Sequence, residues 1–118
     1  MQNFRNLLVW QKAHELALLT QRITADFPRD ETFGLKNSLR RISVDIPSHI
    51  AEGSGRRSDA EFSKSLLSAL GLANRLEYQA LLSRDLVLLA SEAHVKYESA
   101  VIEVKKMLNK LNSQLDTR

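Results

Sequence analysis

Apolar residues recur at intervals of three and four along most of the chain, the spacing that places them on one face of an α-helix. Four separate stretches show this pattern. The first two contain Val9, Ala13, Leu16, Thr20, Ile23 and Phe27, then Leu35, Leu39, Ile42, Ile46 and Ile50. The last two contain Phe62, Leu66, Ala69, Ala73, Leu76 and Ala80, then Tyr97, Val101, Val104, Leu108, Leu111 and Leu115. The pattern predicts four helices, over about 4–27, 35–52, 58–83 and from Ser91 onward.

Turn residues separate these stretches. Pro28 ends the first helix, because the residue before a proline is pushed out of the helical region. Gly53 is expected to supply the backbone freedom of a helix end and Gly55 a second flexible point, so the predicted turn runs from Gly53 to Arg57. The run 58–61 (SDAE) is typical of a capping box that starts the next helix.

Four amphipathic helices with short connections predict an all-α fold, an antiparallel up-down-up-down four-helix bundle. A chain of 118 residues is the length of one ordinary domain, so a single domain over 1–118 is expected. Small residues at 69, 71 and 73 are expected to permit close helix packing. Leucines that lie off the seams, Leu86 and Leu88 among them, either widen the core or form an interface.

The formal charge of +3 is concentrated in the second helix and its turn. That segment has five basic residues and two acidic ones: Lys36, Arg40, Arg41, Arg56 and Arg57 against Asp45 and Glu52. Because the rest of the chain has twelve of each, the whole excess falls here, as in a local anion-binding surface or simply a solvated helix edge. Glu52 lies where the helix dipole disfavours a carboxylate, so Arg56, a backbone amide or another subunit should compensate it.

The candidates for chemistry are weak. His14, His49 and His94 fall on three different helices without a metal motif, and His14 and His94 are expected at the surface. The run 53–58 (GSGRRS) lacks the spacing of a phosphate-binding loop, and no nucleophile motif is present. We therefore expect no catalytic residues, no metal site and no cofactor. No apolar run approaches the roughly 20 residues of a membrane helix, so a cytoplasmic protein without membrane contact is expected.

The run from Arg40 to Arg56 (RRISVDIPSHIAEGSGR) resembles the signature of the 23S rRNA-intervening sequence proteins, a family of small four-helix bundles. Further similarities are the runs 8–13 (LVWQKA), 27–28 with 33–35, and 69–71 with 76–77. The chain departs from the family pattern at His49, where asparagine is usual, and at Asp45, Leu72 and Arg75, where serine, serine and glutamate are typical.

The resemblance implies an antiparallel bundle that often assembles as a homopentameric ring, with no established enzymatic activity. It implies structural roles for Trp10, Glu52 and Gly53. Some family members are encoded within insertions of ribosomal RNA genes, and related bundles are accessory subunits of retroelement reverse transcriptases.

Two hypotheses follow. The first is a non-catalytic oligomer that binds nucleic acid, RNA before DNA, or serves a nucleoprotein complex through Arg40, Arg41, Arg56 and Arg57. The second is a scaffold or accessory subunit for a protein, such as a reverse transcriptase, without nucleic-acid contact. Oligomerisation would favour the first, because linked weak sites act together.

Overall fold

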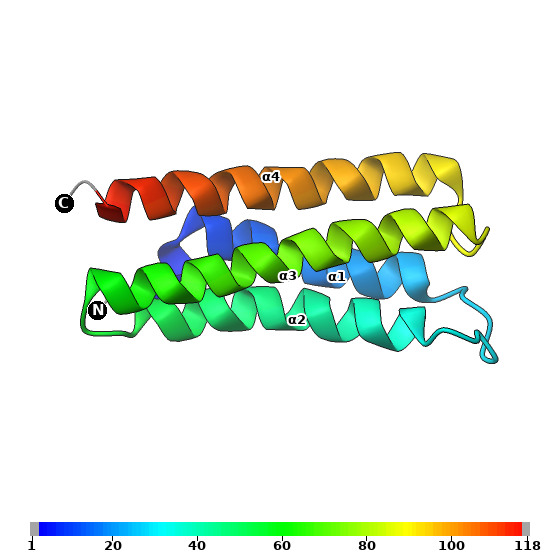
Figure 1. Ribbon diagram of the computed structural model, residues 1–118, viewed down its shortest axis with the longest axis horizontal. Coiled ribbons are helices and arrows are strands. Elements are labelled where there is room, and N and C mark those ends of the chain that lie inside the picture. Colours follow the sequence, from blue (N-terminus) through cyan, green and yellow to red (C-terminus); the bar gives the residue numbers. More distant parts are fainter. Residues whose placement is uncertain (1–2, 117–118) are drawn as a thin grey trace.

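A computed structural model describes residues 3–116, which form four long α-helices, one short 3-10 helix and no strand. The elements are η1 (Phe4–Asn6), α1 (Leu8–Thr24), α2 (Leu35–Ser54), α3 (Asp59–Asp85) and α4 (Ser91–Asp116). The four α-helices lie side by side along the long axis, and each runs opposite to the one before it (Figure 1). The predicted up-down-up-down bundle is therefore confirmed.

The apolar stripes form the core. Every stripe residue of α2 and α3 is buried, as are Val9, Ala13 and Leu16 of α1. In α1 the pattern departs by one position near its end, where Thr24 is buried and Ile23 is only half-buried. The periodicity thus predicted the buried face of each helix nearly residue by residue.

A polar contact explains the one polar residue in the α1 stripe. The Thr20 hydroxyl donates to the carbonyl of Leu16 at 2.8 Å, so its oxygen accepts from the Tyr97 hydroxyl of α4 at 2.6 Å. Both side chains are fully buried, and burial raises the pKa of the Tyr97 phenol. The pair satisfies two polar groups that would otherwise be costly in the core.

The first helix is shorter than predicted. Leu7 has extended backbone angles, so 4–6 form a separate 3-10 turn before α1 begins at Leu8. The phenyl ring of Phe4 then packs edge-on against Trp10, with ring centroids 4.9 Å apart. At the other end α1 stops at Thr24, three residues before the position that its apolar pattern suggested.

Gly53 does not end α2, contrary to the prediction. The helix continues to Ser54, and Gly53 is buried inside it. A β-carbon at this position would lie 2.5 Å from Cβ and 2.9 Å from Oγ of Ser65 on α3. Gly53 is therefore required by the close approach of two helices. Gly55 has a φ of −89°, so the turn before α3 needs no left-handed residue.

The start of α3 matches its prediction, since the Ser58 side chain accepts from the backbone amide of Glu61 at 3.2 Å. Gly71 is different from expectation: it lies on the exposed side of α3, and a β-carbon there would meet nothing within 4 Å. It has no part in close helix packing.

The end of α3 has the hydrogen bonds of a Schellman motif. The amide of Leu88 donates to the carbonyl of Ser83, and the amide of Val87 donates to that of Arg84, both at 2.9 Å. The left-handed position in this motif is usually glycine, but here Val87 occupies it with a φ of 63°. The β-branched side chain is 89% exposed, so no packing offsets its backbone strain.

Candidate nucleic-acid interface

The four candidate arginines have different surroundings. Arg40 points toward the end of α1, where its Nε donates to Thr24 Oγ1 at 2.8 Å and its Nη2 to the carbonyl of Gln21 at 3.2 Å. A cation suits this place, because the last carbonyls of a helix are unpaired and partly negative. Arg40 thus links α2 to α1 by hydrogen bonds, a contact that the sequence pattern did not indicate.

Arg41 lies on the outer side of the bundle, as expected for a nucleic-acid contact. It is exposed and borders a hollow of about 470 Å³ between α2 and α3. Arg75 of α3 borders the same hollow and is also exposed. Within residues 3–116 neither guanidinium forms an ion pair, so both can bind an anion.

Arg56 and Arg57 lie in the turn after α2, and both are exposed. Arg56 Nη2 donates to Glu52 Oε1 at 2.8 Å, which confirms that Glu52 has a compensating partner. Arg57 has no ion pair with another described residue. Fifteen residues separate Arg41 from Arg56, and at 1.5 Å per helical residue this is roughly 20 Å along the bundle. The four arginines therefore do not form one cluster.

Arg75 is a candidate residue that the charge count along the sequence did not indicate. Ser38 faces Gln79 across a 2.7 Å hydrogen bond, and Gly53 faces Ser65, so the residue opposite Arg41 is about Leu76. A short turn between two antiparallel helices fixes this register once their ends are known. Pairing positions across the predicted hairpin would have placed Arg75 beside Arg41.

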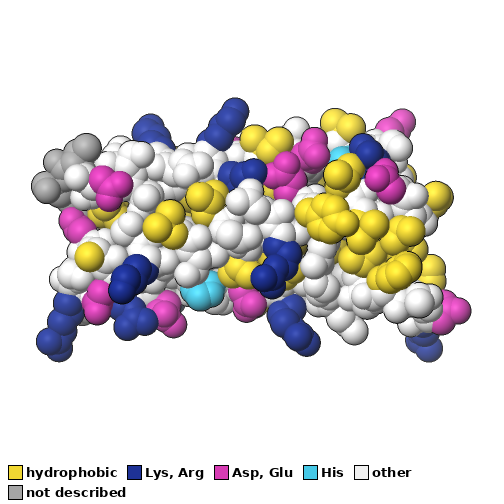
Figure 2. Space-filling model, in the orientation of Figure 1, with side chains coloured by type: hydrophobic (Ala, Val, Ile, Leu, Met, Phe, Trp, Pro, Cys, Tyr) yellow, Lys and Arg dark blue, Asp and Glu magenta, His cyan; other side chains and the backbone are white. Residues whose placement is uncertain are grey.

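Figure 2 shows the face that contains α3, with α2 along its lower edge. Lys and Arg side chains project along this lower edge, and Asp and Glu side chains lie between several of them (Figure 2). Hydrophobic side chains gather instead toward the end where α3 is followed by α4 (Figure 2). The exposed apolar residues in that region of the chain are Tyr78, Leu86, Val87 and Val95.

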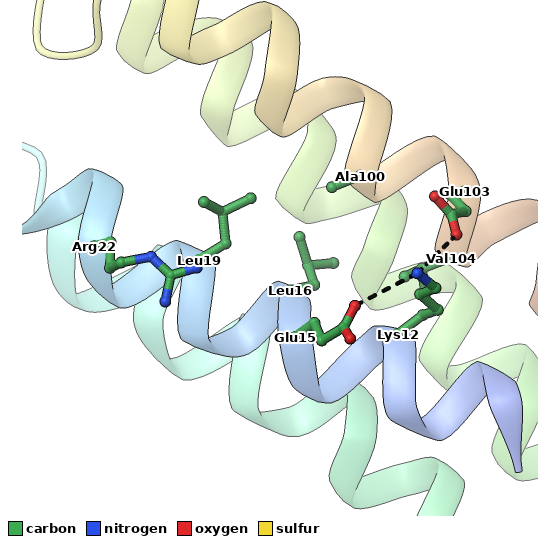
Figure 3. A pocket seen from close by; sticks show the side chains of 8 residues that line it. All are labelled: Lys12, Glu15, Leu16, Leu19, Arg22, Ala100, Glu103 and Val104. Atoms are coloured by element: carbon green, nitrogen blue, oxygen red, sulfur yellow. Dashed lines mark ion pairs between the residues drawn. The ribbon is translucent and has the colours of Figure 1, made fainter.

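A second hollow, about 300 Å³, lies between α1 and α4 and is shown in Figure 3. Lys12 lies between two carboxylates there, with Nζ 3.6 Å from both Glu15 Oε2 and Glu103 Oε1 (Figure 3). Arg22 adds a second cation at the far end, so bases and acids balance. A balanced lining of this kind gives an anion less attraction than the hollow between α2 and α3, where Arg41 and Arg75 outnumber Asp45.

A third hollow, about 420 Å³, is apolar and lies between α1 and α2. It is lined by Phe4, Trp10, Ala17, Leu18, Val44, Pro47 and Ala51, with His14, Gln21 and Ser48. Leu18 and Val44 are about half exposed. We call this surface the apolar groove.

The histidines do not come together. His14 is exposed and stacks on Trp10, as a surface residue should, and His49 is half-buried on α2. His94 was expected at the surface, but it is only 3% exposed, because it lies three residues before Tyr97 on the buried face of α4. No three His, Asp or Glu residues within 3–116 are placed to hold a metal ion. In the same part of the chain, no helix has the length and hydrophobicity to span a membrane.

The comparisons with known proteins agree with this fold. A family model described as 23S rRNA-intervening sequence protein matches residues 5–110. A crystal structure of a protein of unknown function from the S23 ribosomal protein family of Bacteroides thetaiotaomicron is similar, with a TM-score of 0.82 and 23% identity. The similarity covers 89% of this chain and 98% of that chain, and at this identity it shows the fold alone. No curated protein matches the sequence.

Proposed function

This chain belongs to the 23S rRNA-intervening sequence protein family, and we propose that it is a non-catalytic protein that binds nucleic acid, RNA before DNA. The observation that supports the proposal is the exposure of Arg41, Arg57 and Arg75, none of which has an ion-pair partner among residues 3–116. Exposed guanidinium groups displace the counterions that surround the phosphates of nucleic acid, and the release of these counterions drives binding.

The contact surface is the outer face of α2 with the turn after it and the facing edge of α3. Arg41 and Arg75 contribute at its middle, and Arg56 and Arg57 at its end. The two groups of arginines are roughly 20 Å apart. This distance corresponds to several nucleotides, since each strand of a duplex carries one phosphate every 3.4 Å. Arg40 contributes only through the fold, because its donors are engaged with α1.

Self-association is part of the proposal, because one subunit presents few charges. The apolar groove supports it: the half-buried Trp10 and the exposed Leu18 and Val44 line it together, and water would leave this surface if a second copy covered it. Val44 lies on α2 three residues after Arg41, so copies that meet over the groove would place their arginines near one another. Linked weak sites then act together. A pentamer is the number expected from the family resemblance.

The second candidate is a scaffold or accessory subunit for a protein partner, for example a reverse transcriptase. The observation in its favour is the exposed apolar group near the end of α3, in which Tyr78 is 60% and Val95 is 64% exposed. Leu86, which is 39% exposed, remains a suitable test position. Leu88 is not suitable, because it packs against the core and its replacement by aspartate would test folding instead.

The test is fluorescence anisotropy of labelled single-stranded RNA, duplex RNA and duplex DNA at about 50 and 200 mM salt. The variant R41A/R56A/R57A removes three exposed guanidinium groups and leaves Arg40 in place. The control variant R22A/K106A removes two exposed cations on α1 and α4. Binding should weaken with salt, and its log-log slope on single strands should fall by about 0.7 for each phosphate that the variant no longer binds. A folded protein that binds no probe at 50 mM would exclude the proposal and favour the scaffold.

A further inference from the structure

The hollow between α2 and α3 has a more specific chemistry than a phosphate contact requires. Arg41 and Asp45 lie one turn apart on α2, and Arg75 and Gln79 lie one turn apart on α3. Ser38 donates its hydroxyl to Gln79 Oε1, which fixes the amide and leaves its N–H groups available. Two cations, one carboxylate and one oriented amide thus surround a single hollow of about 470 Å³.

Asp45 is the unexpected member of this set. A carboxylate beside two arginines usually pairs with one of them, but within residues 3–116 Asp45 has neither an ion pair nor a side-chain hydrogen bond. The residue is half-buried and lines the hollow. An ionised carboxylate only accepts hydrogen bonds, so a ligand that satisfies it must present N–H or O–H groups.

We propose that this hollow binds one guanine nucleotide of a single-stranded nucleic acid. A backbone phosphate lies between the Arg41 and Arg75 guanidinium groups, and Asp45 accepts from the N1–H and 2-amino groups of the base. Guanine is the base that offers two adjacent donors on its Watson–Crick edge, and this edge is free only in an unpaired strand. The inference rests on the proposed nucleic-acid function and names the ligand of that surface.

The other bases fit Asp45 less well. Uracil has carbonyl oxygens on both sides of its N–H, and these would face the carboxylate as acceptor against acceptor. Adenine and cytosine each present one amino group beside a ring nitrogen that accepts. A hollow of this volume is within the range of small-ligand sites, about 300–1,000 Å³, so a single extruded nucleotide is a suitable occupant.

The test uses octanucleotides of uridine with one central guanosine, with inosine, adenosine or cytidine in its place, and with uridine throughout. Inosine lacks only the 2-amino group, so it removes one of the two donors. The wild type should bind the guanosine strand at least about 5-fold tighter than the uridine strand, as for a bidentate base contact, with inosine in between. A matching DNA series, with thymidine in place of uridine, shows whether the hollow takes the guanine from RNA or from DNA. A preference for guanine in either series supports the proposal.

Two variants separate the parts of the hollow. D45N is close in shape and removes a negative charge, so it should bind the uridine strand at least as tightly as the wild type and lose the preference for guanine. R41A/R75A should bind all strands more weakly, whereas R22A/K106A, which removes the same charge elsewhere, should not. Circular dichroism confirms that each variant is folded.

Equal wild-type binding of the guanosine and uridine strands, or a guanine preference that survives in D45N, would overturn this inference and leave the proposed function standing. Absence of binding to every strand at low salt would overturn both.

Discussion

The packing of Gly53 against α3 gives the sharpest prediction about the fold. A β-carbon at Gly53 would lie 2.5 Å from Ser65 Cβ, 2.9 Å from Ser65 Oγ and 3.0 Å from Phe62 Cδ1. Ordinary carbon contacts begin at 3.4 Å, so the two helices would have to separate by almost 1 Å. Ser65 Cβ is attached directly to the α3 backbone, so a side-chain rotation cannot relieve the clash.

The change in the free energy of unfolding caused by Gly53→Ala is the sum of two opposing effects. Overpacking a buried contact costs about 1–3 kcal/mol, and a clash with an atom this close to the backbone belongs at the upper end. Alanine returns about 1 kcal/mol through its higher helix propensity. We expect a net loss of about 2 kcal/mol, or a Tm lower by about 8 °C for a chain of this size.

The matched control is Gly71→Ala. Gly71 is also inside a helix, but its β-carbon would meet nothing within 4 Å, so only the propensity gain applies. This variant should be more stable than the wild type by about 1 kcal/mol. The same chemical change thus has opposite signs at two positions of one bundle.

Urea unfolding followed by circular dichroism, at one fixed protein concentration, measures both variants. Ser65→Gly removes the two nearest atoms, so the double variant G53A/S65G should recover most of the stability, with a coupling energy above about 1 kcal/mol. A Gly53→Ala protein as stable as the Gly71→Ala protein, with no coupling to Ser65, would refute the close approach of α2 and α3.

Three further predictions concern single side chains. Val87→Gly should raise the stability by about 1 kcal/mol in urea unfolding, because glycine removes the left-handed strain and the valine side chain packs against nothing; an unchanged midpoint would contradict the Schellman motif. Arg40→Met should lower the stability by about 2 kcal/mol, because the α1 end loses a charged donor, yet RNA anisotropy should show the wild-type affinity; a large drop in affinity would show that Arg40 contacts RNA directly. Tyr97→Phe should cost about 1 kcal/mol at neutral pH. Because burial raises the pKa of Tyr97, the unfolded chain loses this proton first, so wild-type stability should fall above about pH 10 more steeply than that of the phenylalanine variant; parallel curves in pH-dependent unfolding would contradict it.

Local periodicity was sufficient to predict the fold and most of the core. Leu39, Ile46 and Leu76 could be assigned because a helix needs one apolar face, whatever covers it. Thr20 interrupted its stripe for a reason that lies on another helix, the hydroxyl of Tyr97. Nothing in the residues around Thr20 indicates that partner.

The candidate site was predicted only in part, because a charge count does not give the direction of a side chain. Arg40 and Arg41 are adjacent, so a helix turns them about 100° apart, and one reaches α1 while the other remains exposed. Gly53 was predicted to end α2, because a glycine close to a turn usually marks the end of a helix. Its partner Ser65 lies on another helix and is found only by pairing positions across the turn, because no residue next to Gly53 in the sequence indicates the contact.

The contact between these arginines and nucleic acid can be observed directly in an NMR titration that follows the arginine side-chain Nε–H signals during addition of single-stranded RNA. These signals report on each guanidinium separately, so they distinguish the contact face from the rest of the charge. We predict that the signals of Arg41, Arg57 and Arg75 shift, that the signal of Arg56 shifts as it leaves Glu52, and that the signals of Arg40 and Arg22 stay in place. Shifts centred on Arg22, or none at all with saturating RNA at low salt, would contradict this prediction.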